Sequence, residues 1–344
     1  MTYRARVALV SAALLMLSAC AGPGASPTAA PPTAAPPTQA PATEAPMTEA
    51  PMTEAPMTEA PMTEAPATVT PAASPAAITC DNLPAEAEGD VLAEICERGR
   101  LIAFTDPAYP PQSFLNEETG AYEGFDIDVT NEIAERLGIA EVEFTTPSFD
   151  LVVAGEWSGR FDLAVGSVTV TEDRKERLDF TQPYYFTPAQ MTTHPDSGIT
   201  DIAGFDGETI CVGEATTYLD WLEGTLTLPP EAGEVADPPE GALSTTLPTD
   251  LDCAEAWRAG RLDFSGWLTA QPTAQQALDD EFPVVFVGDP VFFEPLAVAL
   301  DGSVENNDVF HAAVDAIVGE MHADGTLTEL SETWYDGLDL TTQE

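Results

Sequence analysis

One arginine in the sequence stands in a pattern suited to binding a small anion. Arg174 follows the segment G-S-V-T-V-T, which begins at Gly166. A guanidinium at the first turn of a helix can hold a carboxylate through two parallel hydrogen bonds. Ser167 and Thr169 alternate on one face of the expected strand and can offer hydroxyls to the same anion, while Gly166 lets the backbone come close. This pattern predicts a carboxylate site.

A second cluster of donors lies further along the chain. Ala215, Thr216 and Thr217 follow a short apolar strand and open a helix. The first amides of a helix have no partner within the helix, and its dipole favours negative charge. The sequence therefore predicts two segments, far apart in the chain, that can face one anion.

Short strands alternate with helices around these segments. Strands are predicted at 100–105, 161–165, 210–212, 284–287 and 296–300. Besides the helix that Thr217 opens, three more helices are predicted. The first is capped by Asp126, with Val129, Ile133, Ala134 and Leu137 on its apolar face. The second runs from Thr171 through Arg177, and the third, from Asn307 to Met321, buries Phe310, Val314, Ile317, Val318 and Met321. This alternation indicates an α/β architecture with central sheets.

Five segments resemble a known family, the bacterial extracellular solute-binding proteins of the polar amino-acid branch (family 3), which are the ligand-capturing subunits of ABC importers. They cover roughly residues 98–336 in the family's order. The segments are R-L-I-A-F-T-D-P-A-Y-P-P at 100–111, G-F-D-I-D-V-T-N-E-I-A-E-R-L at 124–137, F-D-L-A-V-G-S-V-T-V-T-E-D-R at 161–174, L-D-F-T-Q-P-Y-Y at 178–185 and A-D-G-T-L…W-Y near the end.

The resemblance implies a two-lobed periplasmic-binding-protein-like fold of type II. Each lobe would be a central sheet flanked by helices, and two crossing strands would join the lobes. We expect lobe I to comprise residues 80–188 and 290–344, and lobe II residues 189–289. The lobes would close on a ligand, and the closed shape would be recognised by the permease subunits of the importer. We expect a monomer without a cofactor.

The resemblance also implies roles for individual residues. The matching positions in the family contact the ligand carboxylate, so Arg174 is expected to be more than a surface charge among its acidic neighbours. Tyr109 and Phe149 match positions whose side chains sandwich the apolar part of the ligand. Asp106 matches a contact to a distal ligand group, although an aspartate before Pro107 can equally cap a turn.

The chain departs from the family at the position that binds an α-ammonium. Amino-acid binders carry an aspartate five positions after the segment G-R-L-D, and this chain has Leu268 there. A buried ammonium without a carboxylate is costly, so either another acid replaces that aspartate or the ligand lacks the amine. Glu214 and Asp106 are the nearest acids by position, and Thr269 offers only a neutral acceptor. Carboxylate recognition is therefore better supported than amino-acid recognition.

The N-terminal region predicts export. Two arginines precede an apolar run of residues 7–17, which is too short to span a bilayer, and L-S-A-C at 17–20 resembles a lipoprotein box. We expect a signal peptide at 1–19 and a lipid on Cys20 that anchors the chain to the outer face of the cell membrane; an ordinary signal peptide with a chance cysteine is the alternative. Residues 20–79, rich in Pro, Thr and Ala with M-T-E-A-P repeats, predict a disordered linker.

Composition excludes some partners. The 344 residues contain 59 Asp+Glu against 11 Lys+Arg, a formal net charge of −48. A field of this sign repels nucleic acid, so no nucleic-acid partner is expected.

The remaining cysteines indicate disulfides. Cys80, Cys96, Cys211 and Cys253 would lie in an oxidising compartment. Of the three connectivities, the local pairs Cys80 with Cys96 and Cys211 with Cys253 are favoured. Metal binding is the weaker alternative, since the sequence has no C-x-x-C pair and no histidine at ligand spacing from a cysteine.

Two other function classes remain open. A few enzymes, including cyclohexadienyl dehydratases, use the same fold, and a buried acid of raised pKa could act as their general acid. The sequence has no Ser-His-Asp order, metal-ligand spacing or phosphate loop, so we expect no enzyme. A ligand-sensing receptor would need a transmembrane or signalling segment, which we do not expect here.

Overall fold

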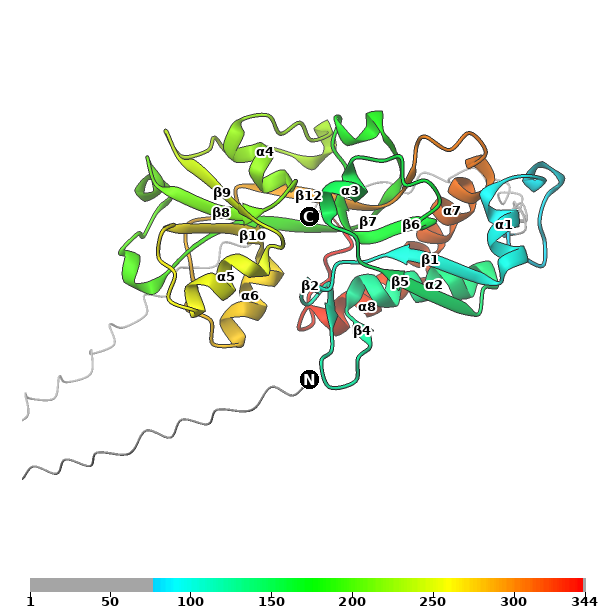
Figure 1. The fold of residues 1–344 in the computed structure, drawn as a ribbon, viewed down its shortest axis with the longest axis horizontal. Coiled ribbons are helices and arrows are strands. Elements are labelled where there is room, and N and C mark those ends of the chain that lie inside the picture. The colour runs from blue at the N-terminus through cyan, green and yellow to red at the C-terminus, as the bar shows by residue number, and fades with distance from the viewer. Residues whose placement is uncertain (1–76, 343–344) are drawn as a thin grey trace, which may run out of the picture. The chain divides into compact units, whose positions relative to one another are not determined.

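The computed structural model describes residues 77–342, which fold around a mixed sheet (Figure 1). The strands of this sheet are β1 (Arg100–Phe104), β5 (Glu141–Thr145), β6 (Leu163–Thr169), β7 (Leu178–Thr193), β8 (Thr209–Gly213), β9 (Leu243–Leu247), β10 (Gly266–Ala270), β11 (Val285–Phe286) and β12 (Phe292–Asp301). Their order is β5-β1-β6-β12-β7-β10-β8-β9, with β11 paired to β7. A small separate sheet contains β2 (Ala108–Tyr109), β3 (Ser113–Leu115) and β4 (Tyr122–Glu123).

Helices flank the main sheet. They are α1 (Val91–Arg98), α2 (Phe125–Leu137), α3 (Phe149–Val153), α4 (Thr217–Glu223), α5 (Leu251–Arg258), α6 (Gln271–Asp279), α7 (Asp308–Asp324) and α8 (Thr326–Trp334). One apolar cluster contains the predicted faces of α2 and α7 together with β1 and β6. Two further clusters lie among β8, β10 and helices α4, α5 and α6. The predicted α/β class is confirmed.

Two long strands join the two halves of the sheet. β7 and β12 pair antiparallel from Phe292 opposite Ala189 to Asp301 opposite Leu178. At one end β12 also pairs with β6, and at the other β7 pairs with β10. The two expected crossing strands are therefore present, and they make the sheets of the two halves continuous (Figure 1). The residue boundaries of the lobes stay a prediction.

Two predicted helix starts are wrong. Helix α2 begins at Phe125 after Gly124, and Asp126 lies in its first turn with a buried side chain instead of capping it. Gly124 has φ 128°, and a Cβ there would lie 2.3 Å from the carbonyl oxygen of Gln112, so only glycine fits. The helix expected from Thr171 is reduced to the 3₁₀ turn η2 (Arg174–Glu176), whose first amide donates to Thr171 Oγ1 at 3.1 Å.

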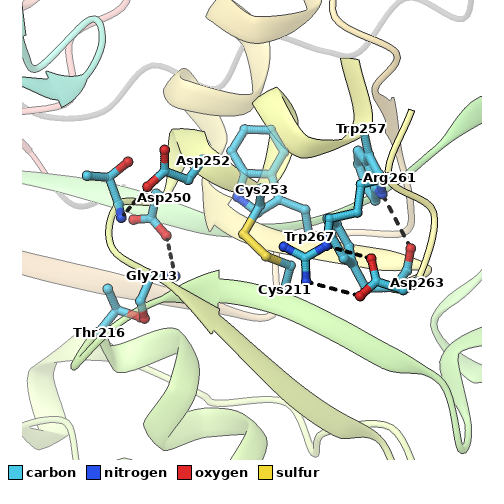
Figure 2. Close-up of a disulfide and its surroundings, with 12 residues drawn as sticks. Cys211, Gly213, Thr216, Asp250, Asp252, Cys253, Trp257, Arg261, Asp263 and Trp267 are labelled. Carbon is cyan, nitrogen blue, oxygen red and sulfur yellow. Dashed lines mark hydrogen bonds and ion pairs between the residues drawn. A yellow bond between two sulfur atoms is a disulfide. The ribbon is translucent and has the colours of Figure 1, made fainter. Parts of the chain in front are cut away.

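Both local disulfides are confirmed. Cys80 bonds to Cys96, and Cys211 bonds to Cys253, linking β8 to helix α5 (Figure 2). The second bridge closes a sequence separation of 42 residues and is fully buried. A cross-link of this length removes much of the freedom of the unfolded chain.

Removal of the second bridge should therefore destabilise the fold. Replacing both Cys211 and Cys253 with alanine should lower the free energy of unfolding by about 4 kcal/mol, because the open chain regains loop entropy. Urea denaturation of the oxidised parent and the double variant measures this. A loss below about 1 kcal/mol would contradict the expectation.

Some predictions concern the N-terminal region. The signal peptide at 1–19, lipidation at Cys20 and the linker up to residue 76 lie outside the described residues. Between residues 77 and 342, no helix combines the length and the apolarity that crossing a bilayer requires.

Candidate functional site

All ten residues that the sequence proposed for ligand binding line one cavity. It lies between β6 and η2 on one side and the connection from β8 to α4 on the other. About 470 Å³ of free space lies among the side chains, including solvent at the mouth. The proposed residues are Asp106, Tyr109, Phe149, Gly166, Ser167, Thr169, Arg174, Glu214, Thr216 and Thr217, and the structure adds Gly213, Tyr218, Pro248, Thr249, Asp250 and Glu294.

Arg174 is a buried cation with unused donors. Its side chain reaches the cavity from η2, and the residue is only 4% exposed. Nη1 donates to the carbonyl of Thr169 and Nη2 to that of Ala215, each at 3.0 Å. Burial lowers the pKa of Arg174 below its ordinary value, yet arginine stays charged. Among the described residues, no carboxylate forms a salt bridge with it, so its remaining N–H groups can serve an anion.

The aromatic residues line the cavity as expected. The Phe149 ring lies against the guanidinium, with the Arg174 Cζ atom 5.4 Å from its centroid. The hydroxyl of Tyr109 lies 3.2 Å from that of Tyr218 on helix α4. Phe149 therefore restrains the cation as well as bounding the cavity.

The two hydroxyls proposed on β6 are directed differently from the prediction. Ser167 Oγ donates to Asp126 Oδ2 at 2.8 Å, and Thr169 Oγ1 donates to Glu294 Oε1 at 2.7 Å. Both hydrogens are thus engaged by protein carboxylates and are not free for a common anion. The sequence could not reveal this, because the acceptors come from α2 and β12.

Asp126 accepts the hydrogen bond of Ser167 within a buried network. It is fully buried, and its Oδ1 accepts a hydrogen bond from the Tyr184 hydroxyl at 2.7 Å. The Ser167 hydroxyl also lies 2.6 Å from that of Tyr185. Burial raises the pKa of Asp126 to about 7, against the lowering effect of its two hydroxyl donors. This network holds Ser167 at φ 54°, a left-handed conformation that non-glycine residues seldom adopt.

Glu294 is a carboxylate that the sequence analysis missed. It is 2% exposed on β12, and its oxygens accept hydrogen bonds from the hydroxyls of Thr169, Thr217 and Tyr218. Burial raises its pKa. A single acid within the apolar segment F-F-E-P-L-A-V-A-L is the signal that could have identified it, since an acid there must be satisfied in the core.

The connection from β8 to α4 supplies the remaining predicted residues. Thr216 precedes the helix as its N-cap residue, and its hydroxyl donates to the Gly213 carbonyl at 2.9 Å. Thr217 donates to Glu294, whereas the Glu214 side chain is exposed at the cavity. This segment therefore contributes mainly backbone and hydroxyl groups.

Two aspartates lie at the cavity without a basic partner among the described residues. Asp106 Oδ1 accepts a hydrogen bond from the Ala108 amide at 2.8 Å, so it caps a turn and lines the cavity at once. Burial raises its pKa to about 6. Asp250, which the sequence analysis missed, accepts a hydrogen bond from the Gly213 amide at 3.0 Å, and burial raises its pKa well above the ordinary value.

Leu268, the departure from the family pattern, and Gln112, which follows the two prolines, both lie in the interior. Leu268 is fully buried in the apolar cluster of the second half. Gln112 is also fully buried, and its side-chain amide forms a hydrogen bond with the hydroxyl of Thr273. Neither residue lines the cavity.

Gly166 is required by packing. A Cβ at this position would lie 2.5 Å from Cε1 of Phe104, whose ring packs against that of Phe149. Gly166→Ala should therefore lower the free energy of unfolding by about 2 kcal/mol in urea denaturation. Adding Phe104→Leu makes room for the methyl group, so the double variant should lose less than the sum of the two single losses. Simple additivity would contradict this account.

Residues 101–337 match the family model described as bacterial extracellular solute-binding proteins, family 3. The chain is 28% identical over 259 residues to the L-cystine-binding protein TcyJ of Escherichia coli (strain K12), which covers 74% of this chain and 89% of the relative. It is 31% identical over 244 residues to the L-arginine-binding protein of Pseudomonas aeruginosa, with 67% and 85% covered.

Solved structures share the fold. An ancestral amino acid-binding protein, described as a precursor of cyclohexadienyl dehydratase, superposes with a TM-score of 0.59 at 26% identity, covering 71% of this chain and 99% of that one. The substrate binding protein of an amino acid ABC transporter has a TM-score of 0.59 at 22% identity, with 69% and 99% covered, and supports the fold alone. The chain thus has the two-lobed architecture of these proteins.

Proposed function

Because the chain belongs to the bacterial extracellular solute-binding proteins of family 3, we propose that it captures a small carboxylate-bearing ligand for an ABC importer. The observation that carries this proposal is the buried Arg174 guanidinium, which lines the cavity with donors to spare. A charged fork in a site shielded from water binds a carboxylate bidentately and selectively. The ligand is a polar amino acid or a derivative of one, in keeping with the names of the relatives.

Capture proceeds by closure of the two lobes. We assign residues 80–188 and 290–344 to one lobe and 189–289 to the other, with β7 and β12 as the connection. Three contacts cross this division and support the closure of one lobe on the other: Arg174 with the Ala215 carbonyl, Tyr109 with Tyr218, and the Glu172 amide with the Thr227 carbonyl at 3.0 Å. A ligand that bridges the same surfaces stabilises the closed form, which the permease subunits recognise.

The N-terminal sequence and the family support a location outside the cell. We propose that Cys20 carries the lipid, that residues 21–79 tether the monomeric body to the membrane, and that the body works beside its permease. Radiolabelled palmitate incorporation, abolished by Cys20→Ser, tests the anchor.

The relatives reported above are named as binding proteins, which favours capture over catalysis.

Direct binding tests the proposed capture. The purified protein is titrated calorimetrically with the common amino acids, L-cystine and their decarboxylated counterparts, such as agmatine for L-arginine. We expect at least one carboxylate compound to bind stoichiometrically without product, and to add about 2.7 kcal/mol of stability at a hundred times its Kd. Equal binding of the decarboxylated counterpart, or turnover seen by NMR, would overturn the proposal.

A further inference from the structure

The charges that line the cavity are unbalanced. Of the described residues around it, Arg174 is the cation, whereas Asp106, Glu214, Asp250 and Glu294 are acids. Glu294 is satisfied by three hydroxyl donors. Glu214 is exposed to water. The two aspartates remain: each accepts one hydrogen bond from a backbone amide, and neither has a basic partner among the described residues.

Asp250 is the more enclosed of the two. It is 7% exposed and directly precedes helix α5, and its Oδ1 accepts a hydrogen bond from the Gly213 amide at the end of β8 (Figure 2). Within residues 77–342 this is the hydrogen bond that its carboxylate makes, so Oδ2 has no protein donor while the residue lines the cavity. The neighbouring Thr249 Oγ1 is likewise buried at the cavity without a partner among these residues.

A buried carboxylate without a basic partner would be stabilised by a bound cation. Burial without a counter-charge disfavours the ionised form, and Asp106 raises the pKa of Asp250 further by charge repulsion. Leu268 is fully buried among apolar side chains and supplies no charge. A ligand cation between the aspartates would remove both penalties, which no neutral ligand can do.

We propose that Asp250, together with Asp106, binds a cationic group of the ligand, so that the ligand is a zwitterion whose carboxylate lies at Arg174. This deepens the proposed function and rests on it. Asp250 thereby fills the role of the aspartate that Leu268 replaces, from a different element of the same half of the fold.

Matched pairs of ligands test the proposal. Each zwitterion is compared with a cation-free carboxylate of the same skeleton: L-arginine with 5-ureidopentanoate, L-glutamine with glutaramate, and L-cystine with 3,3′-dithiodipropionate. Isothermal titration should show that a zwitterion binds the parent protein about 100-fold more tightly than its cation-free partner. Asp250→Asn keeps the acceptor for the Gly213 amide and should reduce this ratio to below about 5-fold.

A matched control separates contact from long-range charge. Asp252 lies two residues further along, accepts a hydrogen bond from the Thr249 amide at 3.0 Å, and does not line the cavity (Figure 2). Asp252→Asn should leave the ratio within about threefold of the parent value, since Asp252 acts on the site only through its charge, which contributes to the raised pKa of Asp106. Circular dichroism and thermal melts verify that both variants are folded.

The outcomes distinguish this inference from the proposed function. A cation-free partner that binds as tightly as its zwitterion, or a folded Asp250→Asn protein with an unchanged ratio, overturns the inference and leaves carboxylate capture standing. If none of the common amino acids, L-cystine or the cation-free partners binds, carboxylate capture fails, and the inference fails with it.

Discussion

Replacing Arg174 with methionine should weaken the binding of a carboxylate ligand by at least about 30-fold, because truncating one partner of a buried charged pair costs roughly 2–5 kcal/mol. Methionine keeps the apolar contact with Phe149 but removes every donor. The guanidinium also donates to the carbonyls of Thr169 and Ala215, so stability without ligand falls as well. The dissociation constant measured by calorimetry is therefore the deciding quantity.

Two companion variants make this result specific. Arg174→Lys retains the charge but loses the planar fork, so its affinity should lie between those of the parent and the methionine variant. Arg177 lies in the same segment and pairs with Asp173 at the surface. Arg177→Met should leave the dissociation constant within about twofold. A folded Arg174→Met protein that binds as well as the parent would contradict the assigned site.

Replacing Asp126 with asparagine should change how stability depends on pH. The pKa of Asp126 is raised from 3.8 to about 7 by burial, so the folded protein favours the protonated acid. Its contribution is fully present below the unfolded value and is lost as pH rises toward 7, by about 1.4 kcal/mol per unit or about 4 kcal/mol in total. Asparagine does not titrate, so the variant should gain that amount relative to the parent between pH 4 and pH 8 in urea denaturation.

A second substitution should act in the opposite direction. Tyr184 donates its hydroxyl to Asp126, which favours the ionised acid. Tyr184→Phe removes this donor, so the stability loss should extend to higher pH than in the parent. Parallel pH curves for the parent and Asp126→Asn would show that this carboxyl does not change protonation on unfolding.

Local patterns in the sequence predicted much of the fold, the cavity residues between Gly166 and Arg174, and Thr216 and Thr217. The other cavity residues, Asp106, Tyr109, Phe149 and Glu214, were proposed with the help of the family resemblance. The apolar residues predicted for α2 and α7 are buried in the structure, because the helical repeat places them on one face of each helix. The segment from Gly166 to Arg174 was recognisable because its residues share one strand and the turn that follows. The helix starts predicted at Asp126 and Thr171 were wrong. The Asp126 carboxylate accepts hydrogen bonds from Ser167 and Tyr184 in the core, and the Thr171 hydroxyl accepts one from the first amide of a 3₁₀ turn.

The hydrogen-bond partners of the cavity residues could not be predicted from local sequence patterns. Glu294 lies 125 residues from Thr169, and Asp250 lies 37 residues from Gly213. Their contacts exist because β12 runs back beside β6 and because α5 begins at the end of β8. No local pattern specifies which strand neighbours another in a sheet.

The sequence by itself determined the family, the donor fork at Arg174, the local cysteine pairing and the absence of an acid at position 268. Only the tertiary structure decided which acids line the cavity together with that fork and which acceptors the hydroxyls of Ser167 and Thr169 contact. Residue types and their spacing are properties of one segment, whereas the charge balance of a buried cavity depends on every segment that the fold brings to it.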